Sequence, residues 1–130
     1  MAKIEKFEDI IVWQRSRELT KEIYLLTSKG KFEKDFGLRD QLRRSVVAIS
    51  LNVVEGFERG GDKEFSQFLY IAKGSAGEVR AILYTALDIE YISEEKFKDL
   101  YKKISEISQL LTGLIKYLKQ SEFKGVKYKS

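Results

Sequence analysis

The side chains that could perform chemistry in this 130-residue chain are carboxylates, amines, guanidinium groups and hydroxyls, because it contains no cysteine and no histidine. This excludes thiolate nucleophiles, imidazole bases, serine–histidine triads and metal sites with Cys or His ligands. Glu55, Glu58 and Glu78 could pair for acid–base catalysis, but the charged faces of helices explain them more simply. The segment 73–75 (KGS) does not fit a phosphate-binding loop, whose glycines precede the lysine and follow a strand. We therefore expect no catalysis, no metal and no cofactor.

Basic residues beside tyrosines provide the chemistry for binding a polyanion. Arginine and lysine neutralise phosphates, and tyrosine rings stack on bases. Lys73 and Arg80 occur between Tyr70 and Tyr84. The cations for which we predict contact with nucleic acid or another partner are Arg43, Arg44, Arg59, Lys73 and Arg80. The same side chains could instead form ion pairs between subunits with Asp40, Glu58 or Glu78.

The elements that must position these side chains are helices. The chain has no proline, which favours long helices with short connections. Apolar residues recur at spacings of three and four in four stretches, which predict helices at about 9–28, 36–60, 62–92 and 94–118. Asp9, Asp62 and Ser93 are the expected N-caps, and a charged connection is expected at 29–35. The pattern predicts an all-α fold, an antiparallel up-down-up-down four-helix bundle over residues 1–120.

Two of the predicted helices carry apolar or small residues on a second side. A helix in a monomeric bundle needs one apolar face, and Gly74 and Gly77 each cost up to about 1 kcal/mol relative to alanine. Close approach of another backbone or ring would explain them. We therefore predict a homo-oligomer whose interface contains Val47, Leu51, Val54, Tyr70, Gly74, Gly77, Ala81 and Tyr84. The alternative is that these are ordinary surface residues. Asn52, on the core side of its helix, is expected to have a structural role through hydrogen bonds, with contact to a ligand as the alternative.

The positive charge is concentrated at the C-terminus. The net charge is +4, and residues 119–130 contribute +3 of it. Residues 121–130 are therefore expected to form a basic, flexible tail that either aids solubility or contacts an acidic partner. No segment resembles a signal peptide or approaches the ~20 apolar residues of a membrane span, so we expect a cytoplasmic protein with no membrane partner.

Motifs along nearly the whole chain resemble one known family. They are 7–14 (FEDIIVWQ), 36–38 (FGL), 41–45 (QLRRS), 52–56 (NVVEG) with Arg59, 64–65 (EF), 68–69 (FL), 71–75 (IAKGS) with Glu78, and 91–92 (YI). At this spacing the chain resembles the 23S rRNA intervening-sequence protein family, also called four-helix bundle proteins. That family is related to the accessory variability determinant of diversity-generating retroelements. Leu51 stands where the family commonly has proline. We expect a role in helix packing and subunit contact for the signature residues Asn52, Glu55, Gly56, Gly74 and Ser75.

The resemblance implies a four-helix bundle and, through the accessory variability determinant, a homopentamer that binds nucleic acid and a reverse transcriptase. We therefore predict a non-catalytic homo-oligomeric helical scaffold, with a pentamer favoured, that associates with RNA or DNA. The alternative is a protein-interaction adaptor whose oligomer binds another protein without nucleic acid. An enzyme that uses carboxylates alone is the third and least favoured hypothesis.

Overall fold

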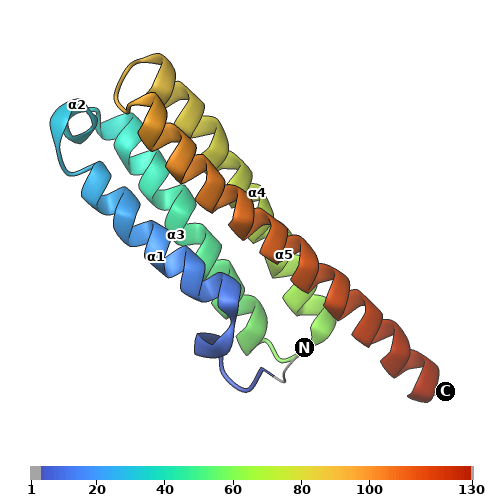
Figure 1. Cartoon of the computed structure of the whole chain (residues 1–130). Helices are drawn as coiled ribbons and strands as arrows, with labels where there is room; N and C mark the ends of the chain where they lie inside the picture. Colours follow the sequence, from blue (N-terminus) through green and yellow to red (C-terminus); the bar gives the residue numbers. More distant parts are fainter. Residues whose placement is uncertain (1–3, 130) are drawn as a thin grey trace.

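The computed structural model describes residues 4–129, and the side chains of residues 4–120. In that range every regular element is helical and no strand occurs, as the all-α prediction requires. A 3₁₀ turn precedes five α-helices: η1 (Phe7–Asp9), α1 (Ile11–Leu26), α2 (Gly30–Lys34), α3 (Phe36–Glu58), α4 (Asp62–Asp88) and α5 (Glu94–Lys129). The four long helices lie side by side along a common direction, with the short α2 between α1 and α3 (Figure 1).

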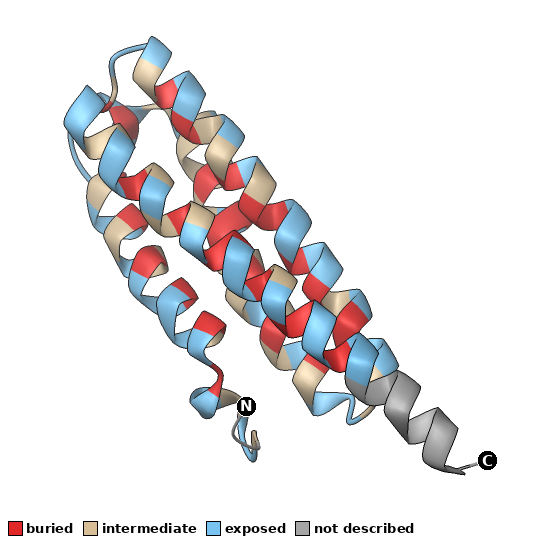
Figure 2. Ribbon diagram, turned by 45° about the vertical axis from the view of Figure 1, so that its right-hand side comes forward, coloured by how far each residue is buried: buried red, intermediate tan, exposed pale blue. Residues whose placement is uncertain are grey.

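The core lies between the inner sides of the four long helices (Figure 2). The side chains of Ile23 in α1, Ile49 in α3, Leu83 in α4 and Leu111 in α5 are completely buried. They belong to the apolar stripes that the spacing of three and four predicts. The closest packing joins α3 to α4 and α4 to α5, whereas α1 makes fewer contacts with α5. Burial of these stripes drives the helices together, since the removal of apolar surface from water is the dominant favourable contribution to folding.

The connection between α1 and α3 differs from the prediction. Residues 29–35 contain the short helix α2 and are not only a charged connection. The reason is Phe32, whose side chain is buried with its ring centroid 5.3 Å from that of Tyr91. The expected N-cap at Asp9 is also wrong, because Asp9 falls in η1 and Ile10 occupies the N-cap position of α1.

Gly56 allows α3 and α4 to approach closely. A Cβ atom added at Gly56 would lie 2.7 Å from the Phe68 Cβ and 3.2 Å from the Phe65 carbonyl oxygen, so only glycine fits without displacement. In the connection that follows, Gly60 adopts a positive φ of 86°. Extended Gly61 takes the N-cap position, which corrects the expectation for Asp62; that residue instead begins α4, where a negative charge suits the helix N-terminus.

Polar side chains fix the starts of α3 and α5. The Asp35 Oδ1 accepts a hydrogen bond from the Leu38 N–H at 3.1 Å, and its Oδ2 accepts one from the Tyr91 hydroxyl at 3.0 Å. The Ser93 Oγ accepts a hydrogen bond from the Lys96 N–H at 3.1 Å, which confirms the predicted cap. The predicted basic tail at 121–130 concerns residues whose side chains lie outside the described part of the chain.

Asn52 is half-buried and makes a hydrogen bond within its own helix. Its Nδ2 donates to the Ala48 carbonyl oxygen at 2.8 Å. The signature residue Ser75 is buried at the inner side of α4. The hydrogen bond of Asn52 thus lies within α3, while Ser75 belongs to the buried side of α4.

Candidate nucleic-acid interface

One side of α4 carries aromatic and basic side chains in a single stripe. Spacings of three and four place five residues along this face, and we call them the α4 stripe: Tyr70, Lys73, Gly77, Arg80 and Tyr84. Tyr70 is 47% exposed, Tyr84 is 50% exposed, and Lys73 is also exposed. The two tyrosines are fourteen residues apart in the sequence, which corresponds to about 21 Å along a helix. The stripe is long enough to contact several nucleotides.

The side chain of Arg80 lies beside Gly77. The nearest atom to a Cβ added at Gly77 would be the Nη2 of Arg80, at 3.7 Å. The guanidinium group therefore lies over Gly77 and extends toward the turn that contains Lys73. Two cations consequently occupy neighbouring turns between the two tyrosines.

Helix α5 adds a lysine and two aromatic rings to the α4 stripe. The Lys119 Nζ donates to the Tyr70 hydroxyl at 2.6 Å and lies 5.1 Å from the centroid of that ring. At the other end of the stripe, the ring centroids of Phe97 and Tyr101 lie 4.9 Å and 5.6 Å from that of Tyr84. A hydrogen bond with Tyr101 raises the pKa of Tyr84 against the opposing effect of the Arg80 charge, so the Tyr84 phenol is neutral at physiological pH.

These contributions from α5 were not predicted from the sequence. The aromatic residues of α5 follow helical spacing and could have been noticed. Their position beside Tyr84, however, depends on the register between α4 and α5, which the periodicity of each helix does not contain.

Arg43 does not lie on the α4 stripe, because it holds the end of α1 against α3. Its Nε donates to the Thr27 Oγ1 at 2.8 Å, and its Nη2 donates to the Ser28 Oγ at 3.2 Å. Its guanidinium carbon lies 4.5 Å from the ring centroid of Tyr24. Helix α1 ends at Leu26, so these contacts stabilise its C-terminal end. The geometry gives Arg43 a structural role.

Arg44 belongs to a polar cluster that joins α3 to α4. Its Nη2 donates to the Gln41 Oε1 at 2.9 Å. The Gln41 Nε2 donates to the Glu78 Oε2 at 3.3 Å, and the Ser45 Oγ contacts the same oxygen at 3.5 Å. Glu78, considered above for an ion pair between subunits, is thus connected to Arg44 within one chain through Gln41.

Arg59 is also occupied by contacts within the chain. Its Nη2 lies 3.1 Å from the Glu55 Oε1, and its guanidinium carbon lies 5.2 Å from the ring centroid of Phe68. Asp40, another residue considered for a pair between subunits, accepts a hydrogen bond from the Arg39 Nε at 2.9 Å, which lowers the pKa of its carboxyl group. The structure therefore brings together Lys73 and Arg80, but not all five predicted cations.

The residues predicted for an oligomer interface differ in exposure. Val47 is half-buried and packs against the core. Val54 is half-buried as well. Leu51 is 60% exposed, and a Cβ added at Gly74 would have no atom within 4 Å. Ala81 is exposed, while Tyr70, Gly77 and Tyr84 make the contacts of the α4 stripe described above.

One exposed apolar residue was missing from the predicted interface. Ile71 is 53% exposed and lies three residues before Gly74, on the same side of α4. An apolar residue on the polar side of the helical pattern would have indicated that Ile71 belongs to the predicted interface.

Two further features bear on the chemistry available to this chain. Within the part of the chain that the structure describes, no group of three or more Asp or Glu residues is arranged to hold a metal ion. None of the described helices combines the length and the apolar composition needed to cross a membrane.

Comparisons with known proteins identify a family and a similar structure. The family described as 23S rRNA-intervening sequence protein matches residues 8–113, a range that contains the whole α4 stripe. A similar crystal structure is that of a protein with unknown function from the S23 ribosomal protein family of Bacteroides thetaiotaomicron. It has 28% sequence identity and a TM-score of 0.75, and the alignment covers 82% of this chain and 96% of that chain. No match was found among curated proteins.

Proposed function

Because the chain belongs to the 23S rRNA-intervening sequence protein family, we propose that it is a non-catalytic, homo-oligomeric helical scaffold that associates with RNA or DNA in the cytoplasm. The resemblance to the accessory variability determinant favours a pentamer, with a reverse transcriptase as a candidate partner. The similar crystal structure is of a protein with unknown function, and the residues of this chain support the proposal.

We propose an antiparallel up-down-up-down four-helix bundle of α1, α3, α4 and α5 as the architecture of each subunit. The order of the contacts between α3 and α4 supports it. Gly56, near the end of α3, lies against Phe68 in the first turns of α4, whereas Ser45 lies against Glu78 farther along α4. Later residues of one helix thus meet earlier residues of the next, as in helices that run in opposite directions.

The α4 stripe is the observation that carries the nucleic-acid proposal. Lys73 and Arg80 lie between two half-exposed tyrosines, and Lys119 extends the positive charge toward Tyr70. Cations at such a surface neutralise phosphates, and the tyrosine rings provide faces on which bases stack. We therefore assign the phosphate contacts to these two residues of the five predicted from the sequence. Arg43, Arg44 and Arg59 are held by contacts within the chain.

The test is the binding of two fluorescent probes, a single-stranded RNA and a duplex DNA of equal length, measured over a range of salt concentrations. We expect binding at low salt, with the logarithm of the association constant falling linearly with the logarithm of the salt concentration. If neither probe binds at low salt, or if binding does not respond to salt, the nucleic-acid proposal is wrong.

Self-association is tested independently by light scattering of the full chain. One chain has a mass of 15.1 kDa, and we expect a mass several times larger. A mass equal to that of one chain would overturn the proposed oligomer.

The adaptor remains the second candidate function because of one specific observation. Leu51 and Ile71 are 60% and 53% exposed, and the surface at Gly74 is open. Exposed apolar residues of this kind suit a protein partner more than a polyanion. An oligomer that binds neither nucleic-acid probe at low salt would favour the adaptor.

A further inference from the structure

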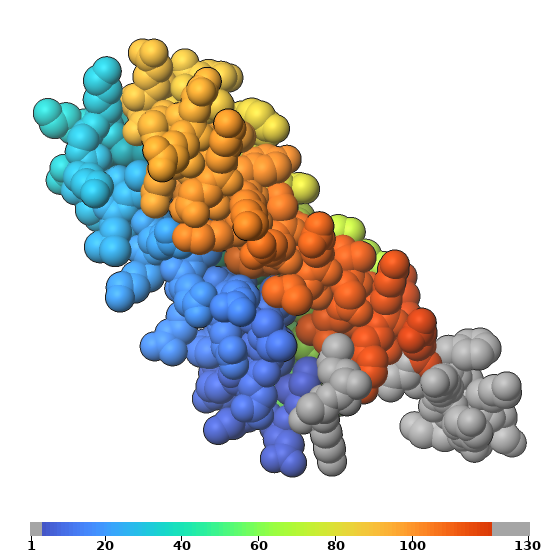
Figure 3. All heavy atoms as spheres, viewed as in Figure 1, coloured from blue at the N-terminus to red at the C-terminus, as the bar shows by residue number. Residues whose placement is uncertain are grey.

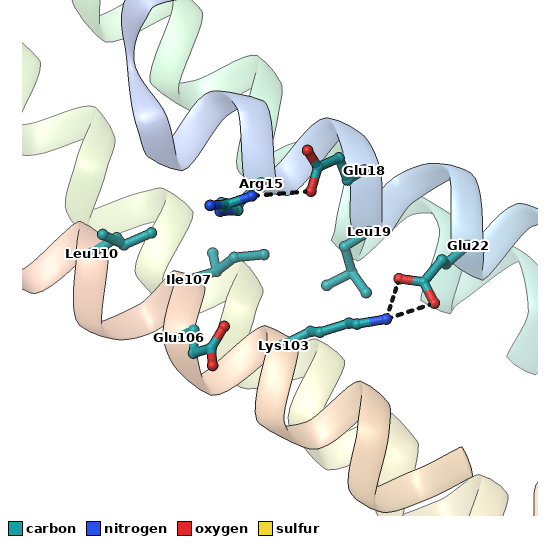
Figure 4. A pocket seen from close by; sticks show the side chains of 8 residues that line it. All are labelled: Arg15, Glu18, Leu19, Glu22, Lys103, Glu106, Ile107 and Leu110. Atoms are coloured by element: carbon teal, nitrogen blue, oxygen red, sulfur yellow. Dashed lines mark hydrogen bonds and ion pairs between the residues drawn. The ribbon is translucent and has the colours of Figure 1, made fainter.

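Helices α1 and α5 leave a groove between them. Near the C-terminal end of α1 the seam is closed, because the Lys103 Nζ lies 2.9 Å from each carboxylate oxygen of Glu22 (Figure 4). This hydrogen bonding with Glu22 raises the pKa of Lys103. Toward the start of α1 a hollow lies between the two helices. Figure 3 shows the seam along which α1 and α5 meet.

The floor of this groove is apolar. Its apolar part has a volume of about 380 Å³ and is lined mainly by Ile4, Ile10, Ile11, Val12, Leu110 and Leu114. Ile11 is 56% exposed, and Leu110 lines both this part and the more polar part nearer Lys103, so the two form one groove. At Gly113 an added Cβ would have no atom within 4 Å, so the wall formed by α5 is open at that point. The groove thus has room for apolar side chains from another segment.

The rim of the groove is acidic. Its charged lining residues are the carboxylates of Asp9, Glu18, Glu22 and Glu106 and the cations Arg15 and Lys103. Glu22 pairs with Lys103, and Glu18 lies 3.4 Å from Arg15. Within the described side chains neither Asp9 nor Glu106 forms an ion pair. The groove is therefore a net negative surface on a chain whose net charge is +4.

We propose that this groove binds the C-terminal segment, residues 119–130, of a second copy of the chain. Lys119 contacts Tyr70 of its own chain. The three further lysines of the segment, Lys124, Lys127 and Lys129, outnumber its one glutamate and complement the acidic rim. The segment also contains Phe123 and Val126. Apolar residues three apart share one side of a helix, which is the pattern of a helix that binds in an apolar groove.

The bound segment must come from a second copy, because it lies on the same helix, α5, that forms one wall of the groove. Gly113 and Leu114 form part of the groove wall, and α5 continues without interruption to Lys129. A segment on that same helix cannot turn back to the groove of its own chain. A groove on one copy and a C-terminal segment on the next form a heterologous contact, which closes into a ring at a suitable rotation.

This inference rests on the proposed homo-oligomer and names the two surfaces that make its contact. It does not compete with the α4 stripe, because the groove lies where α5 meets α1 and the stripe lies where α5 meets α4. One ring can therefore use both surfaces at the same time.

The test uses the full chain carrying Lys124→Glu and Lys127→Glu, whose own segment should no longer occupy the groove. We expect light scattering to give a smaller mass for this variant than for the unaltered chain. A fluorescent peptide with the unaltered sequence of residues 119–130 should bind the variant in a saturable manner. Adding Leu110→Asp or Glu106→Lys to the variant should weaken this binding about tenfold or more.

The matched control is Glu58→Lys, which makes the same charge change at an exposed position on α3 and should leave peptide binding unaltered. Circular dichroism shows whether each variant keeps its helical content. No peptide binding, or equal binding with and without Leu110→Asp, overturns the inference even when the unaltered chain is oligomeric, and the proposed function then stands. A monomeric unaltered chain overturns both the oligomer and this inference.

Discussion

Gly56 of α3 lies so close to Phe68 of α4 that a Cβ added at position 56 would be 2.7 Å from the Phe68 Cβ. The Phe65 ring and carbonyl oxygen border the same point, at 3.0 Å and 3.2 Å. The contact sets the distance between α3 and α4. It also determines the register in which Ser45 and Gln41 meet Glu78 farther along the pair.

Gly56→Ala should therefore destabilise the protein by about 1–2 kcal/mol, because the cost of overpacking exceeds the gain of up to about 1 kcal/mol in helix propensity. Urea unfolding followed by circular dichroism measures this change. The matched variant is Gly74→Ala, at a helical position with no neighbour within 4 Å. It should raise the free energy of unfolding by about 0.5–1 kcal/mol in the isolated subunit. Equal effects from the two variants would contradict the proposed close approach.

Charge reversal on the α4 stripe should weaken nucleic-acid binding. Lys73→Glu with Arg80→Glu removes two proposed phosphate contacts, so the slope of the salt dependence should fall by about two and the affinity at low salt by tenfold or more. Fluorescence anisotropy with the single-stranded RNA probe measures both quantities.

The control for this experiment is Arg17→Glu with Lys21→Glu, which changes the net charge equally at exposed positions on α1. It should leave most of the affinity in place. If it weakens binding as much as the α4 variant does, total charge and not the α4 stripe governs the interaction.

Arg43→Ala should reduce stability and not nucleic-acid binding. The substitution removes hydrogen bonds to the Thr27 and Ser28 hydroxyls and the contact with the Tyr24 ring. Hydrogen bonds of charged groups typically contribute about 1.5–3 kcal/mol, and the partial exposure of this site places the expected loss near the lower end. Thermal unfolding and RNA binding are measured on the same sample. If the variant keeps its melting temperature but loses RNA binding, Arg43 belongs to the nucleic-acid interface.

The hydrogen bond between Tyr91 and Asp35 predicts a pH dependence at alkaline pH. This bond raises the pKa of Tyr91 above its ordinary value of 10.0. A group whose pKa is higher in the folded state contributes its full stabilisation below its unfolded pKa and loses it as the pH rises through the folded value. Tyr91→Phe should therefore lower the melting temperature by a constant amount at neutral pH, and the difference should shrink above about pH 10. A difference that stays constant through this range would show that the hydrogen bond does not stabilise the fold.

The sequence was sufficient to predict those features that depend on one segment alone. The long helices follow from the spacing of their apolar residues, and the cap at Ser93 follows from a serine directly before two glutamates. The α4 stripe was also accessible, because its members share one side of one helix. Asp62 was misjudged because Gly61, with extended backbone angles, takes the N-cap position.

Features that depend on contacts between two segments could not be predicted from the sequence pattern of either segment. Helix α2 forms around Phe32, whose burial requires Tyr91 from a distant connection. The structural role of Arg43 depends on where α1 ends relative to α3. The link between Lys119 and Tyr70 likewise requires the register of α5 against α4.

The carboxylate of Asp35 accepts two hydrogen bonds in different parts of the fold. Its Oδ1 caps α3, and its Oδ2 accepts the hydrogen bond from Tyr91. Few other residues can meet both demands at this position. Asparagine retains a cap oxygen but offers an amide nitrogen, which cannot accept a hydrogen bond from the phenol, and serine has a single oxygen. Position 35 therefore tolerates fewer substitutions than its partial exposure suggests. A substitution accepted there would have to be accompanied by a change at Tyr91.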